Sequence, residues 1–158
     1  MSSNEIDSAE YRRALGCFAT GVAVVTALDT KGEKIGITVN SFNSVSLNPP
    51  LVLWSIGEDS QSFNAFIAAE YFAVNVLATN QQDICEQFAA RGTDKFDGLE
   101  CSDGIASIPI LPEFSAAFEC RAVNCYDGGD HKIIVGRVLK CEDRKTDPLI
   151  FYRGHYLK

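Results

Sequence analysis

The feature that most constrains the fold is a pair of long strand-like segments separated by a glycine turn. Residues 114–126 and 132–141 are rich in β-branched and apolar side chains, and the sequence Asp-Gly-Gly-Asp at residues 127–130 lies between them. Glycine adopts the positive φ angles that tight turns between antiparallel strands require. The pattern therefore predicts an antiparallel hairpin that turns at residues 127–130.

Shorter segments extend this pattern along the chain. Strands are predicted at residues 21–28, 35–39, 51–56 and 71–77, whereas helical spacing is found at residues 7–18, 63–69 and 81–90. Asp7 and Ser62 are the expected helix caps. The regular alternation of strands and helices that produces a parallel sheet is missing. We therefore predict one mainly β domain over residues 1–158, an antiparallel barrel or closed sheet with a few peripheral α-helices.

Composition excludes several classes of protein. With 46% hydrophobic and 22% charged residues, the chain is typical of a globular protein. Its net charge of -7 argues against nucleic acid and anionic membrane surfaces as partners. No apolar run approaches the roughly 20 residues of a membrane-spanning helix. The acidic, polar N-terminus does not resemble a secretory signal, so we expect a cytoplasmic protein.

The six cysteines do not indicate a metal site or a disulfide framework. None has the C-x-x-C spacing and the chain has two histidines, so no metal ligand set is predicted. In the cytoplasm the thiols would stay reduced. Cys120 and Cys125, in strand-like surroundings, are expected to be small buried residues. G-x-G-x-x-G and G-K-[ST] are also missing, so any nucleotide must be held by a different scaffold.

Two segments rich in small polar residues are candidates for binding phosphate. Thr38, Asn40, Ser41, Asn43, Ser44 and Ser46 follow or end a predicted strand. These side chains suit a phosphate and a polar ring edge, or they cap a turn of their own backbone. Ser60, Gln61 and Ser62 precede a predicted helix, where they suit a phosphate or an ordinary helix cap. The residues alone leave both alternatives open.

Three further groups carry charge or aromatic rings. Arg91 and Lys95, next to Phe96, offer positive charge to a ligand phosphate, or they are ordinary solubilising residues. His131 follows the glycine turn beside Asp130, which would bias its protonation. Near the C-terminus, Phe151, Tyr152 and Tyr156 flank Arg153-Gly154, a combination that can stack on a flat ring or simply pack in the core.

Taken together and in order, these blocks resemble the short-chain flavin reductases, the components that supply reduced flavin to two-component monooxygenases. The resemblance covers about residues 11–156 and rests on the following blocks: YRRALG (11–16), FATGV (18–22), GITVNSF (36–42), SVSL (44–47), PPLVL (49–53), FAVNVL (72–77), QFA (87–89), KF (95–96), GDH (129–131) and PLIFYRG (148–154). It implies an FMN-binding split β-barrel that forms a homodimer and binds FMN or FAD near the subunit interface.

The resemblance also implies roles for individual residues. The ring edge and ribityl chain of the flavin would be held by Thr38, Val39, Asn40 and Ser41. The ribityl and phosphate end would be held by Trp54, Ser55, Ser60, Gln61 and Ser62, with Arg91, Lys95 and Phe96 nearby. The nicotinamide nucleotide would contact His131, Tyr152, Arg153 and Gly154.

The implied reaction is a hydride transfer from NADH or NADPH to the flavin. The protein would stack the two rings at roughly 3–3.5 Å, and His131 would position the nicotinamide. No nucleophile or metal is required. The alternatives are a flavin-binding redox carrier or sensor, and a ferric reductase on the same scaffold. A purely structural dimer would bind no flavin. The sequence does not distinguish FMN from FAD or NADH from NADPH.

Overall fold

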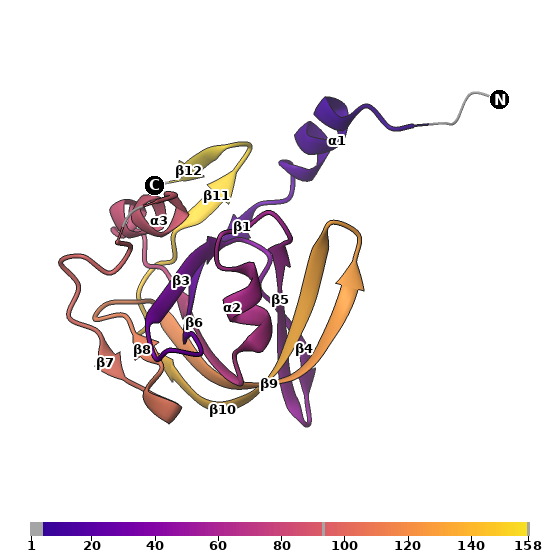
Figure 1. Cartoon of the computed structure of the whole chain (residues 1–158). Coiled ribbons are helices and arrows are strands. Elements are labelled where there is room, and N and C mark those ends of the chain that lie inside the picture. Colours follow the sequence, from indigo (N-terminus) through magenta and orange to yellow (C-terminus); the bar gives the residue numbers. More distant parts are fainter. Residues whose placement is uncertain (1–4, 93, 158) are drawn as a thin grey trace.

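The computed structural model describes residues 5–92 and 94–157. A seven-stranded antiparallel sheet, ordered β3-β2-β6-β9-β10-β5-β4, forms the centre of the molecule (Figure 1). Its strands are β2 (Ala23–Leu28), β3 (Lys34–Val39), β4 (Asn43–Leu47), β5 (Pro50–Gly57), β6 (Tyr71–Val76), β9 (Ala116–Gly128) and β10 (His131–Asp143). The prediction of a mainly antiparallel β fold is therefore confirmed.

The predicted hairpin is the longest pair of strands in this sheet. His131 pairs with Gly128, and the intervening Gly129 has a φ of 71°, as in a two-residue turn that starts with glycine. Register shifts between Val135 and Gly136, and again between Val138 and Lys140, interrupt the ladder. Such bulges bend a strand and increase its twist, which accounts for the strong curvature of β9 and β10 in Figure 1.

The helices confirm the predicted segments, with differences at their ends. They are α1 (Ser8–Leu15), α2 (Phe63–Ala68) and α3 (Gln82–Ala89). The Asp7 carboxylate caps α1, because it accepts hydrogen bonds from the amides of Ala9 at 2.8 Å and Glu10 at 3.2 Å. Ser62 occupies the cap position of α2, but its side chain makes no capping bond and lies 3.3 Å from the Ser60 hydroxyl. The prediction of a serine at the cap position is therefore confirmed, although this serine makes no capping hydrogen bond.

Several short elements were not predicted from the sequence. They are β4 of the large sheet, β1 (Thr20–Gly21), β7 (Ser102–Asp103), the 3-10 turn η1 (Ile105–Ser107), β8 (Pro109–Ile110), β11 (Ile150–Tyr152) and β12 (His155–Leu157). The order β1-β11-β12 makes a small second sheet close to α1 and α3 (Figure 1). Arg153 and Gly154 connect β11 to β12 with φ angles of 48° and 80°, as the central residues of a tight hairpin turn.

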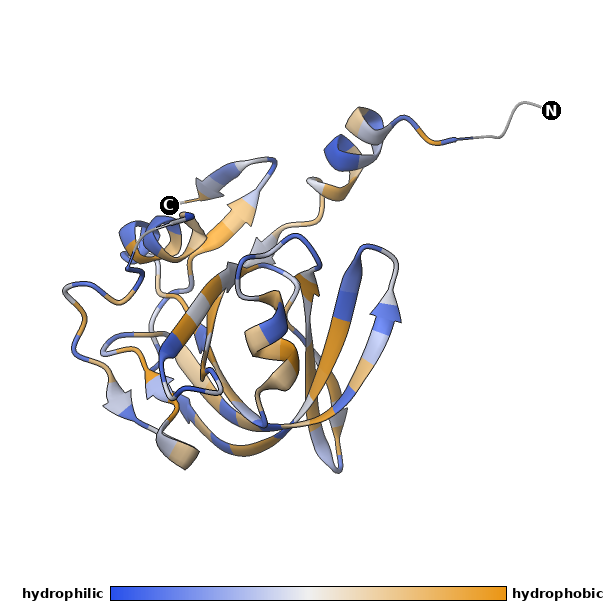
Figure 2. Cartoon of the chain, in the orientation of Figure 1, coloured by the Kyte–Doolittle hydropathy of each residue, from blue (hydrophilic) through white to orange (hydrophobic). Residues whose placement is uncertain are grey.

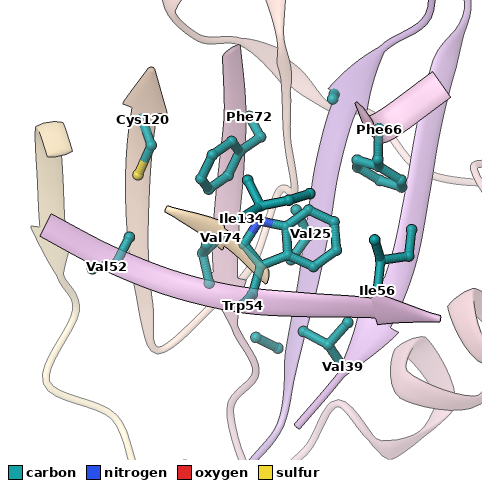
Figure 3. Packing of buried hydrophobic residues seen from close by; sticks show 12 residues of the cluster. Val25, Val39, Val52, Trp54, Ile56, Phe66, Phe72, Val74, Cys120 and Ile134 are labelled. Carbon is teal, nitrogen blue, oxygen red and sulfur yellow. The ribbon is translucent and has the colours of Figure 1, made fainter. Parts of the chain in front are cut away.

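The concave side of the large sheet holds the main hydrophobic core. Along β5, buried and partly exposed residues alternate, and Figure 2 shows the same alternation of apolar and polar residues along the long strands. Trp54 of β5 is fully buried at the centre of this core (Figure 3). Its ring meets Phe66 edge-on at 5.1 Å and Phe72 at 5.9 Å between centroids. The core therefore joins α2 to the sheet.

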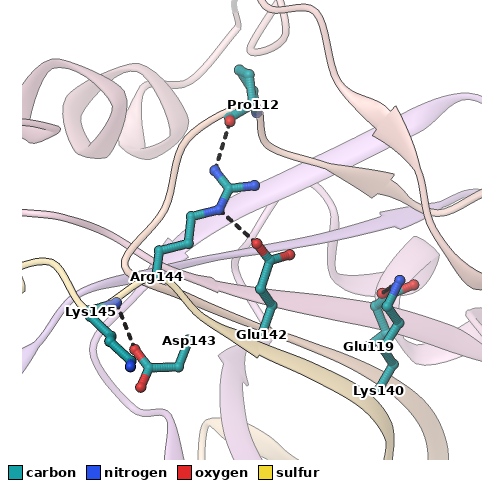
Figure 4. A network of polar contacts seen from close by, with 7 residues as sticks. All are labelled: Pro112, Glu119, Lys140, Glu142, Asp143, Arg144 and Lys145. Atoms are coloured by element: carbon teal, nitrogen blue, oxygen red, sulfur yellow. Dashed lines mark hydrogen bonds and ion pairs between the residues drawn. The ribbon is translucent and has the colours of Figure 1, made fainter.

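Polar contacts attach the connecting segments to this sheet. Asn75 of β6 is buried and donates to the Val24 carbonyl at 3.0 Å and to the Thr26 hydroxyl at 3.1 Å, while its oxygen accepts from the Leu111 amide at 3.1 Å. Arg144, after β10, donates to Glu142 at 2.9 Å and to the Pro112 carbonyl at 3.0 Å (Figure 4). Both side chains hold the segment before β9 in place.

The cysteines differ in their surroundings, although all six are free thiols. Cys120 is fully buried as predicted, and this burial raises the pKa of its thiol from 9.0 to about 12, with a smaller contribution from the charge of Glu119. Cys125 is exposed, so the prediction that it is buried is wrong. It lies in the outer half of β9, where the hairpin extends past the core and most residues are exposed.

Burial of Cys120 predicts a loss of stability at alkaline pH. Above pH 9 the thiol ionises in the unfolded chain but keeps its proton in the folded protein, so the unfolded state binds fewer protons and gains stability as the pH rises toward about 12. The contribution approaches about 1.4 kcal/mol per pH unit. In urea titrations between pH 8 and pH 10.5, Cys120→Ala should show a shallower decline than the wild type. Cys141→Ala, which removes an exposed thiol, is the control variant.

Among the described residues, no helix has the length and apolar character needed to span a bilayer.

Candidate functional site

A large cavity lies where the N-terminal helix meets the C-terminal hairpin. It has a volume of about 660 Å³, in the range of small-molecule binding sites. Its walls come from the end of α1, from β1, from the residue after β3 and from the β11–β12 turn. The lining residues are Arg12, Arg13, Leu15, Gly16, Phe18, Thr20, Asn40, Phe151, Arg153 and Gly154. Apolar walls and a basic rim thus occur in one cavity.

A smaller cavity of about 150 Å³ adjoins the first, because Asn40 and Phe151 line both. Here Thr38, Val39 and Asn40 at the end of β3 face the side chains of Cys85 and Tyr156. The position of Thr38 is fixed by α3, since its hydroxyl donates to the Cys85 carbonyl at 2.7 Å. The predicted segment at the exit of β3 therefore does border a cavity.

The floor of this smaller cavity is electrically neutral. The Cys85 sulfur lies 3.1 Å from the Tyr156 hydroxyl. This hydrogen bond and burial raise the pKa of Tyr156 to about 12, and burial raises the pKa of the Cys85 thiol. Both groups therefore keep their protons near neutral pH, so the floor offers a ligand hydrogen-bonding groups without a charge.

The β11–β12 turn is attached to the end of α1. The Arg153 amide donates to the Gly16 carbonyl at 3.0 Å, and its guanidinium donates to the Tyr152 hydroxyl at 2.8 Å and to the Cys17 sulfur at 3.0 Å. The Tyr152 hydrogen bond is the main cause of the raised pKa of Arg153. Arg153 and Gly154 are thereby held at the rim of the large cavity.

A second group of predicted residues lies at the beginning of β3. Gln61, Ser62, Lys95 and Phe96 line a cavity of about 220 Å³ together with residues 34–36 and Asp94. The Lys95 ammonium donates to the Gly36 carbonyl at 3.2 Å, and its pKa is lowered by burial and then by the charge of Arg91. Arg91 itself is exposed and lies 3.7 Å from Asp59. This group combines a cation, an amide and a hydroxyl.

His131 belongs to a third group at the tip of the β9–β10 hairpin. Its Nδ1 atom lies 2.7 Å from the Asp130 carboxylate, and this hydrogen bond lowers the pKa of Asp130. The imidazole is about half exposed, at 49% of its side-chain surface. It pairs across the sheet with Gly57, where an added Cβ would come within 2.8 Å of Asp59 and 3.5 Å of the imidazole. The structure does not place His131 in either cavity.

Ser41 and Ser55 bind each other. The Ser41 hydroxyl accepts from the Ser55 amide at 2.9 Å and donates to the Ser55 carbonyl at 3.2 Å, which connects the end of β3 to β5. The prediction that the Trp54 side chain holds the ribityl and phosphate end of the flavin is wrong. The indole is fully buried in the core, so it cannot contact a cofactor. The alternation of side chains along β5 turns Trp54 inward and leaves Ser55 on the opposite face.

Sequence reasoning missed the part of the large cavity that comes from the N-terminus. Arg12 and Arg13 on α1, with Leu15, Phe18 and Thr20, were not predicted as site residues although they line the cavity. Two adjacent arginines in a chain of net charge -7 are a signal that was available. Nothing in the local sequence shows that these arginines lie close to Arg153, which is far away in the chain; the fold brings them to one cavity.

The cavities suit an aromatic ring that carries phosphate. Leu15, Phe18 and Phe151 offer apolar contact, Asn40 offers an amide, and the arginines offer charge-assisted hydrogen bonds. Among the residues that the structure describes, no group of three or more His, Cys, Asp or Glu side chains is arranged to hold a metal ion. The donor set present therefore fits an organic anion with a flat ring, as a flavin or nicotinamide nucleotide is.

Comparison with known proteins agrees with this chemistry. Residues 15–158 match the flavin reductase like domain. The chain is 46% identical over 150 residues to the FMN reductase (NADH) SmoA of Agrobacterium fabrum, covering 95% of this chain and 85% of that protein. It is 39% identical over 157 residues to HsaB, the reductase subunit of a flavin-dependent monooxygenase of Rhodococcus jostii, covering 99% of this chain and 80% of that protein.

A solved structure shows the same fold with ligands. The NADH:FAD oxidoreductase SgcE6 of Streptomyces globisporus, in complex with NAD and FAD fragments, superimposes with a TM-score of 0.90 at 35% identity, covering 99% of this chain and 96% of that chain. The chain spans about half the length of some other relatives, for instance 47% of the reductase component of a trigonelline monooxygenase of Acinetobacter baylyi.

Proposed function

Because this chain belongs to the flavin reductase like domain family, we propose that it is an NAD(P)H-dependent flavin reductase. It transfers a hydride from a reduced nicotinamide nucleotide to FMN or FAD and supplies the reduced flavin to a partner monooxygenase. The observation that carries this proposal is the ring-sized cavity with apolar walls and a basic rim beside Thr38, Val39 and Asn40. The relatives that are monooxygenase reductase subunits support the choice of partner.

In this proposal the flavin supplies the chemistry of hydride acceptance, and the chain supplies binding and orientation. Phe18 and Phe151 exclude water from the ring and limit its orientation. Asn40 and the protonated Cys85–Tyr156 pair offer hydrogen bonds to the ring edge without placing a fixed charge beside it. Positioning two reactants in contact accounts for a large part of the rate enhancement that such a reaction needs.

The remaining site assignments are part of the same proposal. Ser41 and Ser55 hold the backbone beside the ribityl chain, and Ser60, Gln61 and Ser62 with Lys95 serve the phosphate end. Support comes from the Lys95 ammonium, which lies 3.2 Å from the Gly36 carbonyl in the cavity shared with Gln61 and Ser62. Arg91 and Phe96 border this region, and Tyr152 with Arg153-Gly154 borders the nicotinamide nucleotide.

Steady-state oxidation of NADH and NADPH, each with FMN, FAD and riboflavin, tests the proposed function. We expect nicotinamide oxidation that depends on added flavin and quenching of flavin fluorescence on binding. Quenching without oxidation would instead identify a carrier or sensor, and the absence of both would leave a structural dimer. Adding ferric iron tests whether reduced flavin that leaves the protein reduces the iron. Adding an oxygenase tests whether the same reduced flavin is delivered to that enzyme.

His131→Ala is expected to raise the KM for NADH more than it weakens flavin binding. The imidazole lies at the hairpin tip and does not line the ring-sized cavity, but it is half exposed and can contact the nicotinamide nucleotide. Loss of one charge-assisted or neutral hydrogen bond predicts an increase of about five- to tenfold in KM. Tyr126→Ala, an exposed ring on the same hairpin, is the control. Equal losses of affinity for NADH and for FMN, by fluorescence titration, would refute the assignment.

We also propose that the protein acts as a homodimer. Helix α1 has no buried residue, and it exposes Tyr11, Leu15 and the nearby Phe18, the last at 77%. Strand β4 is an edge of the large sheet, and its Leu47 is 95% exposed. Unpartnered apolar surface and an open strand edge both favour association. Light scattering of the purified protein should give about twice the monomer mass, and a monomer at micromolar concentration would contradict the proposal.

We propose that residues 1–158 act as one domain and that the curved seven-stranded sheet is the split barrel of the flavin-binding family, which its open strand order from β3 to β4 supports. A cytoplasmic location is supported by the six free thiols, because reducing compartments keep cysteines in this state.

A further inference from the structure

We propose that Arg12, Arg13 and Arg153 form an anion site at the rim of the large cavity, which binds the phosphate or pyrophosphate of a nucleotide. The proposal rests on the proposed function and deepens it, because it adds two arginines of α1 to the β11–β12 turn as ligand-binding residues. Both the flavin nucleotide and the nicotinamide nucleotide carry such a phosphate group, and binding measurements with each ligand distinguish them.

The first observation is a concentration of positive charge without counterions. Arg12, Arg13 and Arg153 line one cavity of about 660 Å³. In residues 5–92 and 94–157, no ion pair joins any of the three to a carboxylate. Three residues of like charge that line one cavity make its potential more positive, which favours a bound anion. The cluster stands out because the chain as a whole carries a net charge of -7.

The second observation is that one of these arginines is held rigidly in an unfavourable backbone conformation. Arg153 has a φ of 48°, in the left-handed region that glycine or asparagine normally occupies. Its amide bonds to the Gly16 carbonyl at 3.0 Å, and its side chain bonds to the Tyr152 hydroxyl at 2.8 Å and to the Cys17 sulfur at 3.0 Å. Pre-ordering of a guanidinium lowers the entropy that binding costs.

The third observation is a polar atom without a partner at the same place. Thr20 lines the cavity, and its hydroxyl oxygen is buried with no hydrogen-bond partner in the described part of the chain. A buried hydroxyl that stays unpaired is costly, so such groups in native proteins are usually satisfied by water or ligand. A phosphate oxygen or a ligand hydroxyl between the arginines and Thr20 would satisfy it.

The fourth observation separates a nucleotide from a simple inorganic anion. Leu15, Phe18 and Phe151 supply apolar walls to the same cavity. Inorganic phosphate gains nothing from such walls, whereas an aromatic ring attached to a phosphate uses both the walls and the basic rim. The cavity is therefore built for an amphipathic anion.

The test compares Arg12→Gln, Arg13→Gln and Arg153→Gln with Lys145→Gln, which removes an exposed positive charge that does not line the cavity. Binding of FMN and riboflavin is measured by flavin fluorescence, and binding of NAD+ and of nicotinamide riboside is measured by calorimetry. Thermal melts check that each variant folds. Because these readouts measure binding, they do not depend on turnover.

We expect at least two of the three arginine variants to weaken the binding of one phosphate-bearing ligand about tenfold, as the loss of a charge-assisted hydrogen bond predicts. The affinity for the matching ligand without phosphate should fall less than twofold. Lys145→Gln should bind every ligand with the affinity of the wild type. A selective loss for FMN over riboflavin assigns the site to the flavin nucleotide, and a selective loss for NAD+ over nicotinamide riboside assigns it to the other substrate. Either result supports the anion site.

Two results would overturn it. The first result is a wild type that binds flavin and oxidises NADH, together with unchanged affinities for FMN and NAD+ in all three variants. This result would refute the anion site and leave the proposed function intact. Equal losses for the ligands with and without phosphate would show that the arginines act on the fold and not on the anion. A wild type that binds FMN and NAD+ without turnover would contradict only the proposed function.

Discussion

Trp54→Ala is expected to lower the free energy of unfolding by about 3–5 kcal/mol, the typical cost of replacing a large buried aromatic residue by alanine. The indole is fully buried, contacts Phe66 and Phe72 edge-on and joins α2 to the sheet. Alanine would leave a cavity between the sheet and α2, where Phe66 packs against the indole. In a chain of this size the melting temperature should fall by about 6–20 °C.

Trp54→Phe is the matched variant. The indole Nε1 atom is buried and has no hydrogen-bond partner among the described residues, so phenylalanine removes an unpaired donor while keeping most of the apolar contact. We expect a loss of about 1–2 kcal/mol, well below that of alanine. Urea unfolding followed by circular dichroism measures both. Equal losses for the two variants would show that volume is not what Trp54 contributes.

Asn75→Leu is expected to destabilise the protein by about 3 kcal/mol or more, although leucine has a similar size. The substitution removes three hydrogen bonds and leaves the Val24 carbonyl, the Thr26 hydroxyl and the Leu111 amide with one partner fewer in a buried place. An unsatisfied buried polar group costs about 1–3 kcal/mol. The segment before β9 should also become more mobile, which hydrogen exchange of the Leu111 amide would report.

A double-mutant cycle with Thr26→Val tests whether this network acts as a unit. The Thr26 hydroxyl donates to the Pro109 carbonyl at 2.5 Å and accepts from Asn75 at 3.1 Å. The two substitutions share this contact, so their costs should add to more than the cost of the double variant. Strict additivity in urea titrations would mean that Asn75 and Thr26 hold the segment independently.

The regular elements could be predicted from the sequence because their signals are local. Asp7 at a helix start and the glycines at residues 128–129 fix short-range geometry, and both features are found where they were predicted. Strands β11 and β12 are three residues each, too short to show an alternating pattern, and their turn uses Arg153 at a positive φ that its residue type does not indicate. The missed elements depend on pairing, not on local composition.

The candidate site could be predicted only in part, for a similar reason. Thr38, Val39 and Asn40 lie next to one another in the sequence, so the resemblance assigned them together, and all three border a cavity. The opposite wall comes from α1, and nothing local shows that Arg12 meets the C-terminal hairpin. The resemblance assigned Trp54 and Ser55 together to the cofactor, but one step along a strand reverses the direction of a side chain.

The position of the indole also gives the protein a built-in optical probe. The chain has a single tryptophan, and it is fully buried in the core between the sheet and α2. Its emission overlaps the near-ultraviolet absorption of oxidised flavin, so energy transfer will dim it when a flavin binds anywhere on a molecule of this size. The binding of flavin, its exchange and its reduction can therefore be followed in real time through tryptophan fluorescence, without any label.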